Sequence, residues 1–158
     1  MQAVLFDWGG TLSVWADVDM VDMWRLAAEH LSPGHSEELT SRLVEVERRY
    51  FDRALTDQKA FALPDLLRAA SEELGIDVGE AVLEEAALRH LDTWTPHIQH
   101  EPDAAEVLSA LRDRGLRTAL LSNTHWPRHF HEHFLERDGL VDLLDARLYT
   151  SEMERTKP

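Results

Sequence analysis

The chain has no cysteine among its 158 residues, and it has almost no lysine. The absence of cysteine excludes disulfide bonds, thiolate metal sites and cysteine nucleophiles, and it fits a reducing compartment. Lys59 and Lys157 are the only lysines, and arginine provides every other basic side chain. Because arginine is the usual cation of this chain, the position of each lysine is informative.

Positive charge is scarce in general. Sixteen Lys and Arg stand against 30 Asp and Glu, which gives a formal net charge of -14 and a pI of about 4.9. Such a surface repels nucleic acid and anionic lipid, so neither is an expected partner. The chain also lacks an apolar run of about 18 residues and an N-terminal secretory segment, so no membrane span is expected. We therefore expect a cytoplasmic protein.

The periodicity of the apolar residues changes along the chain. Residues 2–7, 116–124 and 146–152 are short apolar runs typical of strands buried in a parallel sheet. Residues 102–115 and 126–137 between them have the 3.6-residue period of helices. Strands that alternate with helices predict an α/β fold with a parallel sheet.

A long all-helical stretch interrupts this alternation directly after the first strand. One apolar stripe, for example, includes Leu39 and Leu43 at helical spacing. We predict an inserted helical domain over residues 15–95, and an α/β core made of residues 1–14 plus 96–158. Ligands of open α/β sheets bind beyond the carboxyl ends of the strands, and the insertion is expected to stand over those ends.

Polar residues follow each of the three predicted strands. Asp7 ends the first strand, Ser122 and Asn123 end the second, and Lys157 comes shortly after the third. Because the carboxyl ends of parallel strands meet at one edge of a sheet, these groups are expected to converge. A carboxylate there can act as a nucleophile. The two glycines after Asp7 allow a sharp turn, and their backbone N–H groups can face an anion.

Three segments together resemble a known family. Asp7-Trp8-Gly9-Gly10-Thr11, Leu121-Ser122-Asn123 and Lys157-Pro158 are similar to the first three motifs of the haloacid dehalogenase-like (HAD) hydrolase superfamily. The helical insertion after the first motif is similar to the cap of subgroup I of that family. The resemblance covers essentially the whole chain. It implies a HAD-like Rossmannoid core, with a parallel sheet and an inserted all-helical cap.

The resemblance also implies roles for individual residues. Asp7 is the expected nucleophile, which forms a covalent aspartyl intermediate, and Lys157 is the expected cation that neutralises charge beside it. In phosphatases of the family, Mg²⁺ is held by the nucleophile, by the carbonyl two residues later, here Gly9, and by a later acidic motif. The expected substrate-binding residues are Gly10, Thr11, Ser122 and Asn123.

Gly9 is the first departure from the family pattern. Phosphatases of the family resemble D-x-D-G-T, and their second Asp protonates the leaving group; loss of such a group typically costs about 100- to 10,000-fold in rate. Dehalogenases have a Tyr there, and phosphonoacetaldehyde hydrolases resemble D-W-A-G-T and use a cap lysine, for which Lys59 is available. A dehalogenase needs a cap arginine for the substrate carboxylate. The available arginines are Arg25, Arg42, Arg48, Arg49 and Arg53.

The second departure is that nothing follows Lys157-Pro158. Family members continue with a helix, a fourth strand and an acidic pair that completes the metal site. One carboxylate and one carbonyl make a poor Mg²⁺ site, and the sheet is expected to lack covering on one side. We therefore expect a shortened chain with weak or absent activity.

These observations favour a HAD-like hydrolase of a small anionic substrate, by default a phosphate ester, with Mg²⁺ as cofactor. A dehalogenase or phosphonatase-like hydrolase is the alternative that Gly9 suggests. A catalytically silent interaction protein that forms a homodimer through the cap is an alternative of a different class. His125, just after Ser122 and Asn123, is a further candidate for contact with the substrate.

Overall fold

The computed structural model describes residues 2–157. Its strands and α-helices, in chain order, are β1 (Ala3–Phe6), α1 (Met20–Leu31), α2 (Ser36–Asp57), α3 (Leu63–Glu73), α4 (Glu80–Trp94), α5 (Ala104–Asp113), β2 (Arg117–Ser122), α6 (Arg128–Arg137) and β3 (Ala146–Tyr149). Short 3-10 turns lie at Pro33–His35, Thr95–His97, Val141–Leu143 and Thr150–Glu152. Within the described residues, no helix combines the length and hydropathy needed to cross a membrane.

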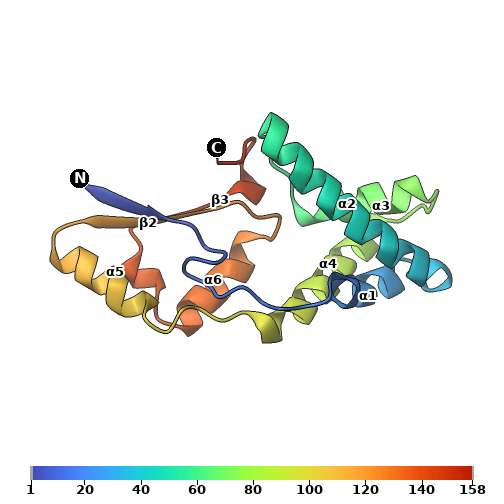
Figure 1. Ribbon diagram of the computed structural model, residues 1–158. Coiled ribbons are helices and arrows are strands. Elements are labelled where there is room, and N and C mark those ends of the chain that lie inside the picture. The colour runs from blue at the N-terminus through green and yellow to red at the C-terminus, as the bar shows by residue number, and fades with distance from the viewer. Residues whose placement is uncertain (1, 158) are drawn as a thin grey trace.

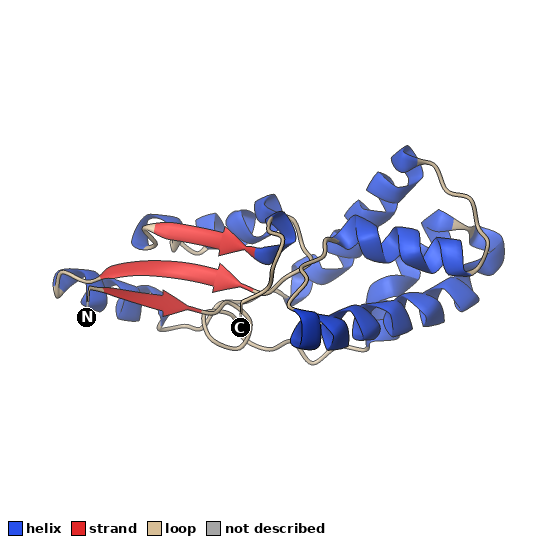
Figure 2. Cartoon of the chain, turned by 90° about the horizontal axis from the view of Figure 1, so that it is seen from above, coloured by secondary structure: helices blue, strands red, loops and turns tan. Residues whose placement is uncertain are grey.

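The three strands form one parallel sheet in the order β1-β2-β3. Phe6 pairs with Leu120, and Ser122 pairs with Tyr149, so the strands end at nearly the same level. All three strands point toward the helices α1–α4 (Figure 2). The α/β fold with a parallel sheet, predicted from the sequence, is confirmed. The second and third strands are shorter than predicted, because the chain turns away after Ser122 and after Tyr149.

The sheet is covered by helices on one face only. Helices α5 and α6 lie below the strands in Figure 1, and no described element lies on the opposite face. On the covered face, Leu120 and Tyr149 are fully buried. On the open face, Leu5 is 59% exposed and Leu148 is 40% exposed. The alternation of buried and exposed residues along β2 follows from this one-sided packing.

Helices α1–α4, called the helical insertion below, pack mainly on one another. α1 contacts both α2 and α4, and Trp24 of α1 is completely buried among them. Asp19 caps α1, because its side chain accepts a hydrogen bond from the Val21 N–H at 2.8 Å. At the other end of the next helix, Gln58 ends α2 in the left-handed conformation, with φ 56°.

Candidate active site

Asp7 and Lys157 form an ion pair at the carboxyl edge of the sheet. The Nζ atom of Lys157 lies 2.6 Å from Oδ2 of Asp7, and the Trp8 N–H donates to Oδ1 of Asp7 at 2.7 Å. Nζ also lies 3.5 Å from the Leu121 carbonyl oxygen, at the end of β2. The two side chains are 40% and 24% exposed, respectively. The carboxylate is therefore held in a fixed orientation while it remains accessible from outside.

Asn123 connects the second strand to this ion pair. Its Oδ1 atom accepts a hydrogen bond from the Lys157 N–H at 2.9 Å. Ser122, one residue earlier, is only 3% exposed and lies on the helix-covered side of β2. The structure thus brings together Asp7, Asn123 and Lys157 by direct contact, while Ser122 lies beside them in the buried layer.

The loop after Asp7 is closed by its own backbone. The Trp8 carbonyl oxygen accepts hydrogen bonds from the N–H groups of Thr11, Leu12 and Ser13, at 3.2, 3.0 and 2.8 Å. Gly10 has φ 69°, and its N–H donates to the Ser13 carbonyl at 2.8 Å. The amides of Gly10 and Thr11 are therefore engaged in hydrogen bonds within the loop in this structure.

Trp8 is anchored by a chain of hydrogen bonds on the core side. Its Nε1–H donates to Nε2 of His100 at 3.1 Å, and Nδ1 of His100 lies 2.7 Å from Oδ2 of Asp138. The hydrogen bond from Arg137, opposed by partial desolvation and aided by His100, lowers the pKa of Asp138 to about 2. The anchored indole fixes the residue whose amide orients Asp7. Sequence reasoning missed this anchor, since His100 and Asp138 lie far from the motif in the chain.

A cavity of about 160 Å³ opens beside Asn123 and Lys157. Its wall on the helical insertion is mainly apolar, and its wall on the core is mainly polar. The lining residues are Phe51, Ala54, Leu55, Gln58 and Phe61 from the insertion, and Asn123, Thr124, Thr150, Thr156 and Lys157 from the core. Such a cavity suits a small molecule with an anionic end and an apolar body.

His125, a candidate for substrate contact, does not line this cavity. It is 5% exposed, and its Nε2 lies 3.6 Å from Oε1 of Glu47. Burial lowers the pKa of His125 well below its usual value. Burial raises the pKa of Glu47 to about 7, against the opposing effect of the hydrogen bond from the Trp24 indole. His125 and Glu47 therefore lie near each other between core and insertion without a hydrogen bond between them.

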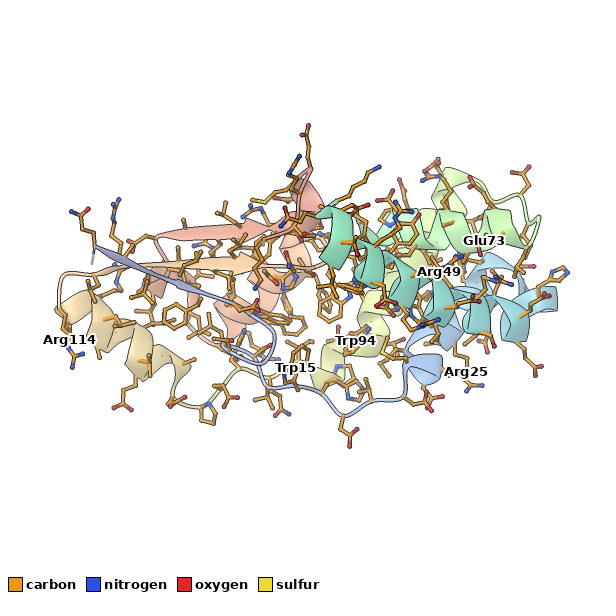
Figure 3. The ribbon with its side chains drawn as sticks, turned by 45° about the horizontal axis from the view of Figure 1, so that its top comes forward. Trp15, Arg25, Arg49, Glu73, Trp94 and Arg114 are labelled. Atoms are coloured by element: carbon orange, nitrogen blue, oxygen red, sulfur yellow. The ribbon has the colours of Figure 1, made fainter. Side chains whose placement is uncertain are left out.

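The cations of the helical insertion do not contact Asp7 within residues 2–157. Figure 3 shows Arg25 and Arg49 on the insertion, with Arg49 beside Glu73. The five arginines pair with acids of the insertion, in the pairs Arg25–Asp22, Arg42–Glu73, Arg48–Asp52, Arg49–Glu73 and Arg53–Asp57. Lys59 is exposed and lines a separate cavity of about 330 Å³. The structure therefore gives neither a Schiff-base lysine nor a carboxylate-binding arginine beside the ion pair.

The residues near Asp7 do not form a complete magnesium site. Among residues 2–157, no group of three or more His, Asp or Glu side chains is arranged to hold a metal ion. Asp7 supplies one carboxylate and Gly9 one carbonyl oxygen, whereas Mg²⁺ prefers six oxygen ligands in an octahedron.

Comparison with known proteins identifies the family. A model of haloacid dehalogenase-like hydrolases matches residues 1–158. L-2-haloacid dehalogenase from Xanthobacter autotrophicus is 27% identical, with a TM-score of 0.52, over 100% of this chain and 60% of that chain. A predicted phosphoglycolate phosphatase from Haemophilus somnus is 18% identical, with a TM-score of 0.54, over 99% of this chain and 66% of that chain. No curated protein matches.

This chain thus spans 60% of the length of the dehalogenase and 66% of the length of the phosphatase. At 18% identity the second likeness shows the fold alone. The match of the family model to the whole chain, together with the parallel sheet and the polar groups at its carboxyl edge, gives the family assignment. The chain belongs to the haloacid dehalogenase-like hydrolases.

Proposed function

We propose that this protein hydrolyses a small anionic substrate by nucleophilic attack of Asp7. An Oδ atom of Asp7 forms a bond to the electrophilic atom as the leaving group departs with its electron pair. Water then cleaves the aspartyl intermediate and restores the carboxylate. The observation that carries this proposal is the 2.6 Å contact between Lys157 Nζ and Asp7 Oδ2, which places a cation beside the nucleophile.

A phosphate ester is the first candidate substrate. Phosphoryl transfer depends mainly on positioning and on cations near the spread negative charge, and Lys157 supplies such a cation. The apolar side chains of Phe51, Leu55 and Phe61 suit the organic part of the ester. In this proposal, the helical insertion acts as a cap whose side chains select that part. HAD hydrolases generally use Mg²⁺, so the assay includes it.

A 2-haloacid is the second candidate, and Gly9 favours it. Gly9 has no side chain that could protonate a leaving group, and a halide ion leaves without a proton. A relative of 27% identity is described as an L-2-haloacid dehalogenase. In this reaction, Asp7 displaces halide from carbon, and Lys157 is the available cation for the substrate carboxylate.

Release of phosphate and of halide from a substrate panel tests both candidates. The panel contains p-nitrophenyl phosphate, small alkyl phosphates and 2-chloropropionate, each with Mg²⁺ or with EDTA. We expect Asp7→Asn to abolish release, and Lys157→Met to lower it by about 100-fold or more. Asp113→Asn, an exposed residue at the end of α5, is the matched control and should keep full activity. Equal release from the wild type and Asp7→Asn would contradict the proposal.

Labelled water tests the covalent step itself. In a single turnover of 2-chloropropionate in H₂¹⁸O, attack of water on the carbonyl carbon of the aspartyl ester leaves ¹⁸O in the carboxylate of Asp7. Mass spectrometry of the peptide that contains Asp7 should detect this label. With this substrate, label found only in the released alcohol would instead indicate direct attack by water on carbon.

A further inference from the structure

We propose that the loop after α2, residues 58–60, positions Lys157 against Asp7. The loop acts through residues 154–157, called the C-terminal strap below. The consequence for catalysis rests on the proposed function. The consequence for the position of Lys157 does not, and the experiment below measures it separately.

The loop and the strap form a short antiparallel bridge centred on Lys59 and Arg155. Two backbone hydrogen bonds flank this pair. They run from the Thr156 N–H to the Gln58 carbonyl at 2.8 Å, and from the Ala60 N–H to the Glu154 carbonyl at 3.1 Å. The bridge thus joins the helical insertion to a segment that ends at the candidate catalytic lysine.

The other end of the strap is fixed to the sheet. The Lys157 N–H donates to Asn123, and its Nζ contacts Asp7 and the Leu121 carbonyl. Between the two attachments, the strap has no helix or strand of its own, and Glu154 and Arg155 are exposed. Because so few contacts hold the strap, the bridge to the loop is a main determinant of where Lys157 lies.

Gln58 has the conformation that this bridge requires. Its φ of 56° and ψ of 21° place it in the left-handed region, and it is the one non-glycine residue with positive φ among residues 2–157. That conformation is unfavourable for an L-residue, because its Cβ crowds the following carbonyl oxygen. Its N–H closes α2 onto Ala54, and its carbonyl then accepts the hydrogen bond from Thr156. Movement of the insertion would therefore move the strap, and Lys157 with it.

Two substitutions at Gln58 form a matched pair. Gln58→Gly and Gln58→Val both remove the same amide side chain from the cavity wall. Glycine favours the left-handed conformation, whereas the β-branched valine disfavours it. A difference between the two variants therefore reports the backbone of the loop and not the lost side chain.

The scarcity of lysine provides a direct reporter. With ¹³C-labelled lysine, the NMR spectrum contains side-chain signals from only Lys59 and Lys157, and Lys59→Arg leaves Lys157 alone. The spectrum of the Asp7→Asn variant gives the position of the Lys157 signal without its ion pair. We expect Gln58→Gly to keep the wild-type position and Gln58→Val to move toward the Asp7→Asn position.

The catalytic rate should change in the same variant in which the Lys157 signal moves. For whichever substrate the panel identifies, kcat should fall at least 10-fold in Gln58→Val relative to Gln58→Gly, with unchanged circular dichroism. An unmoved Lys157 signal in folded Gln58→Val would overturn the positioning role, whatever the activity. A moved signal in a protein that hydrolyses nothing would uphold the positioning role and count against the proposed function only.

A reversible crosslink keeps the test decisive. Lys59 and Arg155 are a non-hydrogen-bonded antiparallel pair, whose Cα atoms lie about 4.5 Å apart in such geometry, within disulfide reach. Because the chain has no other cysteine, Lys59→Cys with Arg155→Cys gives one defined disulfide. In the Gln58→Val background, oxidation should return the Lys157 signal to its wild-type position, and reduction should reverse this. Identical oxidised and reduced signals would overturn the proposal. If Gln58→Val does not fold, the milder Gln58→Ala replaces it.

Discussion

The indole ring of Trp15 lies against Gly10, so closely that a Cβ added to the glycine would overlap the indole nitrogen. A Cβ added to Gly9 would lie 3.3 Å from Cη2 of the same ring. Trp15 is 78% exposed and lies beside the loop that follows β1 (Figure 3). The two glycines after Asp7 therefore give the loop its turn and also leave room for this ring.

Alanine at Gly10 tests this relationship. Gly10 and Gly75 have similar positive φ angles, 69° and 67°, but nothing lies within 4 Å of a Cβ at Gly75. Both alanine variants should lose about 1 kcal/mol of unfolding free energy from backbone strain. Gly10→Ala should lose more, because the indole must move. Urea denaturation measures the difference, and adding Trp15→Ala to Gly10→Ala should remove only the excess. Equal losses at Gly10 and Gly75 would show that the ring imposes no cost.

Aspartate at Gly9 separates the two candidate reactions. The nearby indole is exposed and free to shift, so Gly9→Asp should fold normally. A carboxyl group at this position can protonate an alkoxide leaving group, which is typically worth about 100-fold or more. We expect a gain of that size for alkyl phosphates and none for halide release from 2-chloropropionate. Gly9→Asn is the matched control without the proton. Equal rates for the two variants would argue against a missing acid.

Buried histidines should make the protein unstable in mild acid. Burial lowers the pKa of His90 and of His131 to about 3. Between pH 6.5 and pH 3, the unfolded chain binds protons at these residues and the folded chain does not. The free energy of unfolding should therefore fall as the pH falls below 6.5, by about 3 kcal/mol per histidine at pH 4.5. Denaturation between pH 4.5 and 8 measures this slope, and His131→Asn should reduce it. A flat profile would contradict the burial.

Glu47 should have the opposite pH dependence. Its pKa is raised to about 7 by burial, from an ordinary value of 4.5. The folded state therefore keeps a proton that the unfolded state releases, and stability falls as the pH rises from 4.5 to 7. Because the two histidines act in the opposite direction over the same pH range, Glu47 only partly offsets the rise in stability with pH that they produce. In Glu47→Gln the free energy of unfolding should therefore rise more steeply between pH 4.5 and 7 than in the wild type, and the same denaturation series measures this difference; equal slopes would contradict the raised pKa.

Glu132 should be important for the attachment of β3 to α6. Its carboxylate accepts hydrogen bonds from Arg147 Nε at 2.9 Å and from the Tyr149 hydroxyl at 3.0 Å. The side chains of Glu132 and Arg147 are only partly exposed, at 17% and 24%. We therefore expect Glu132→Ala to cost about 1–3 kcal/mol of unfolding free energy. Glu136→Ala, on the exposed side of α6, is the control. Thermal unfolding of both variants provides the measurement; similar midpoints would argue against the network.

The sequence predicted those parts of the structure that follow from local pattern and from strand direction. Apolar runs gave the three strands, and parallel strands necessarily end at one edge, where the structure places Asp7 and Lys157 together. The same reasoning could not distinguish Ser122 from Asn123. Their roles depend on which side of β2 each side chain leaves, and that depends on where the covering helices lie.

Contacts between segments that are distant in the chain could not be predicted from the sequence pattern. His131 of α6 is fully buried, with Nε2 3.0 Å from the Thr124 hydroxyl, and nothing in the residues around it indicates this contact. The bridge between the loop after α2 and the strap is made by backbone atoms, so the side chains of these residues do not indicate that the bridge forms. Positive φ at Gln58 is another feature that composition does not indicate.

The bare face of the sheet has a consequence for how this sequence can vary. Positions 5, 119, 121 and 148 carry apolar side chains that no described helix covers. Polar replacements at these positions should be tolerated in this chain. Their neighbours at 118, 120 and 149 are buried beneath α5 and α6 and should admit few changes. A library of variants across the strands should therefore show tolerance that alternates with every second residue.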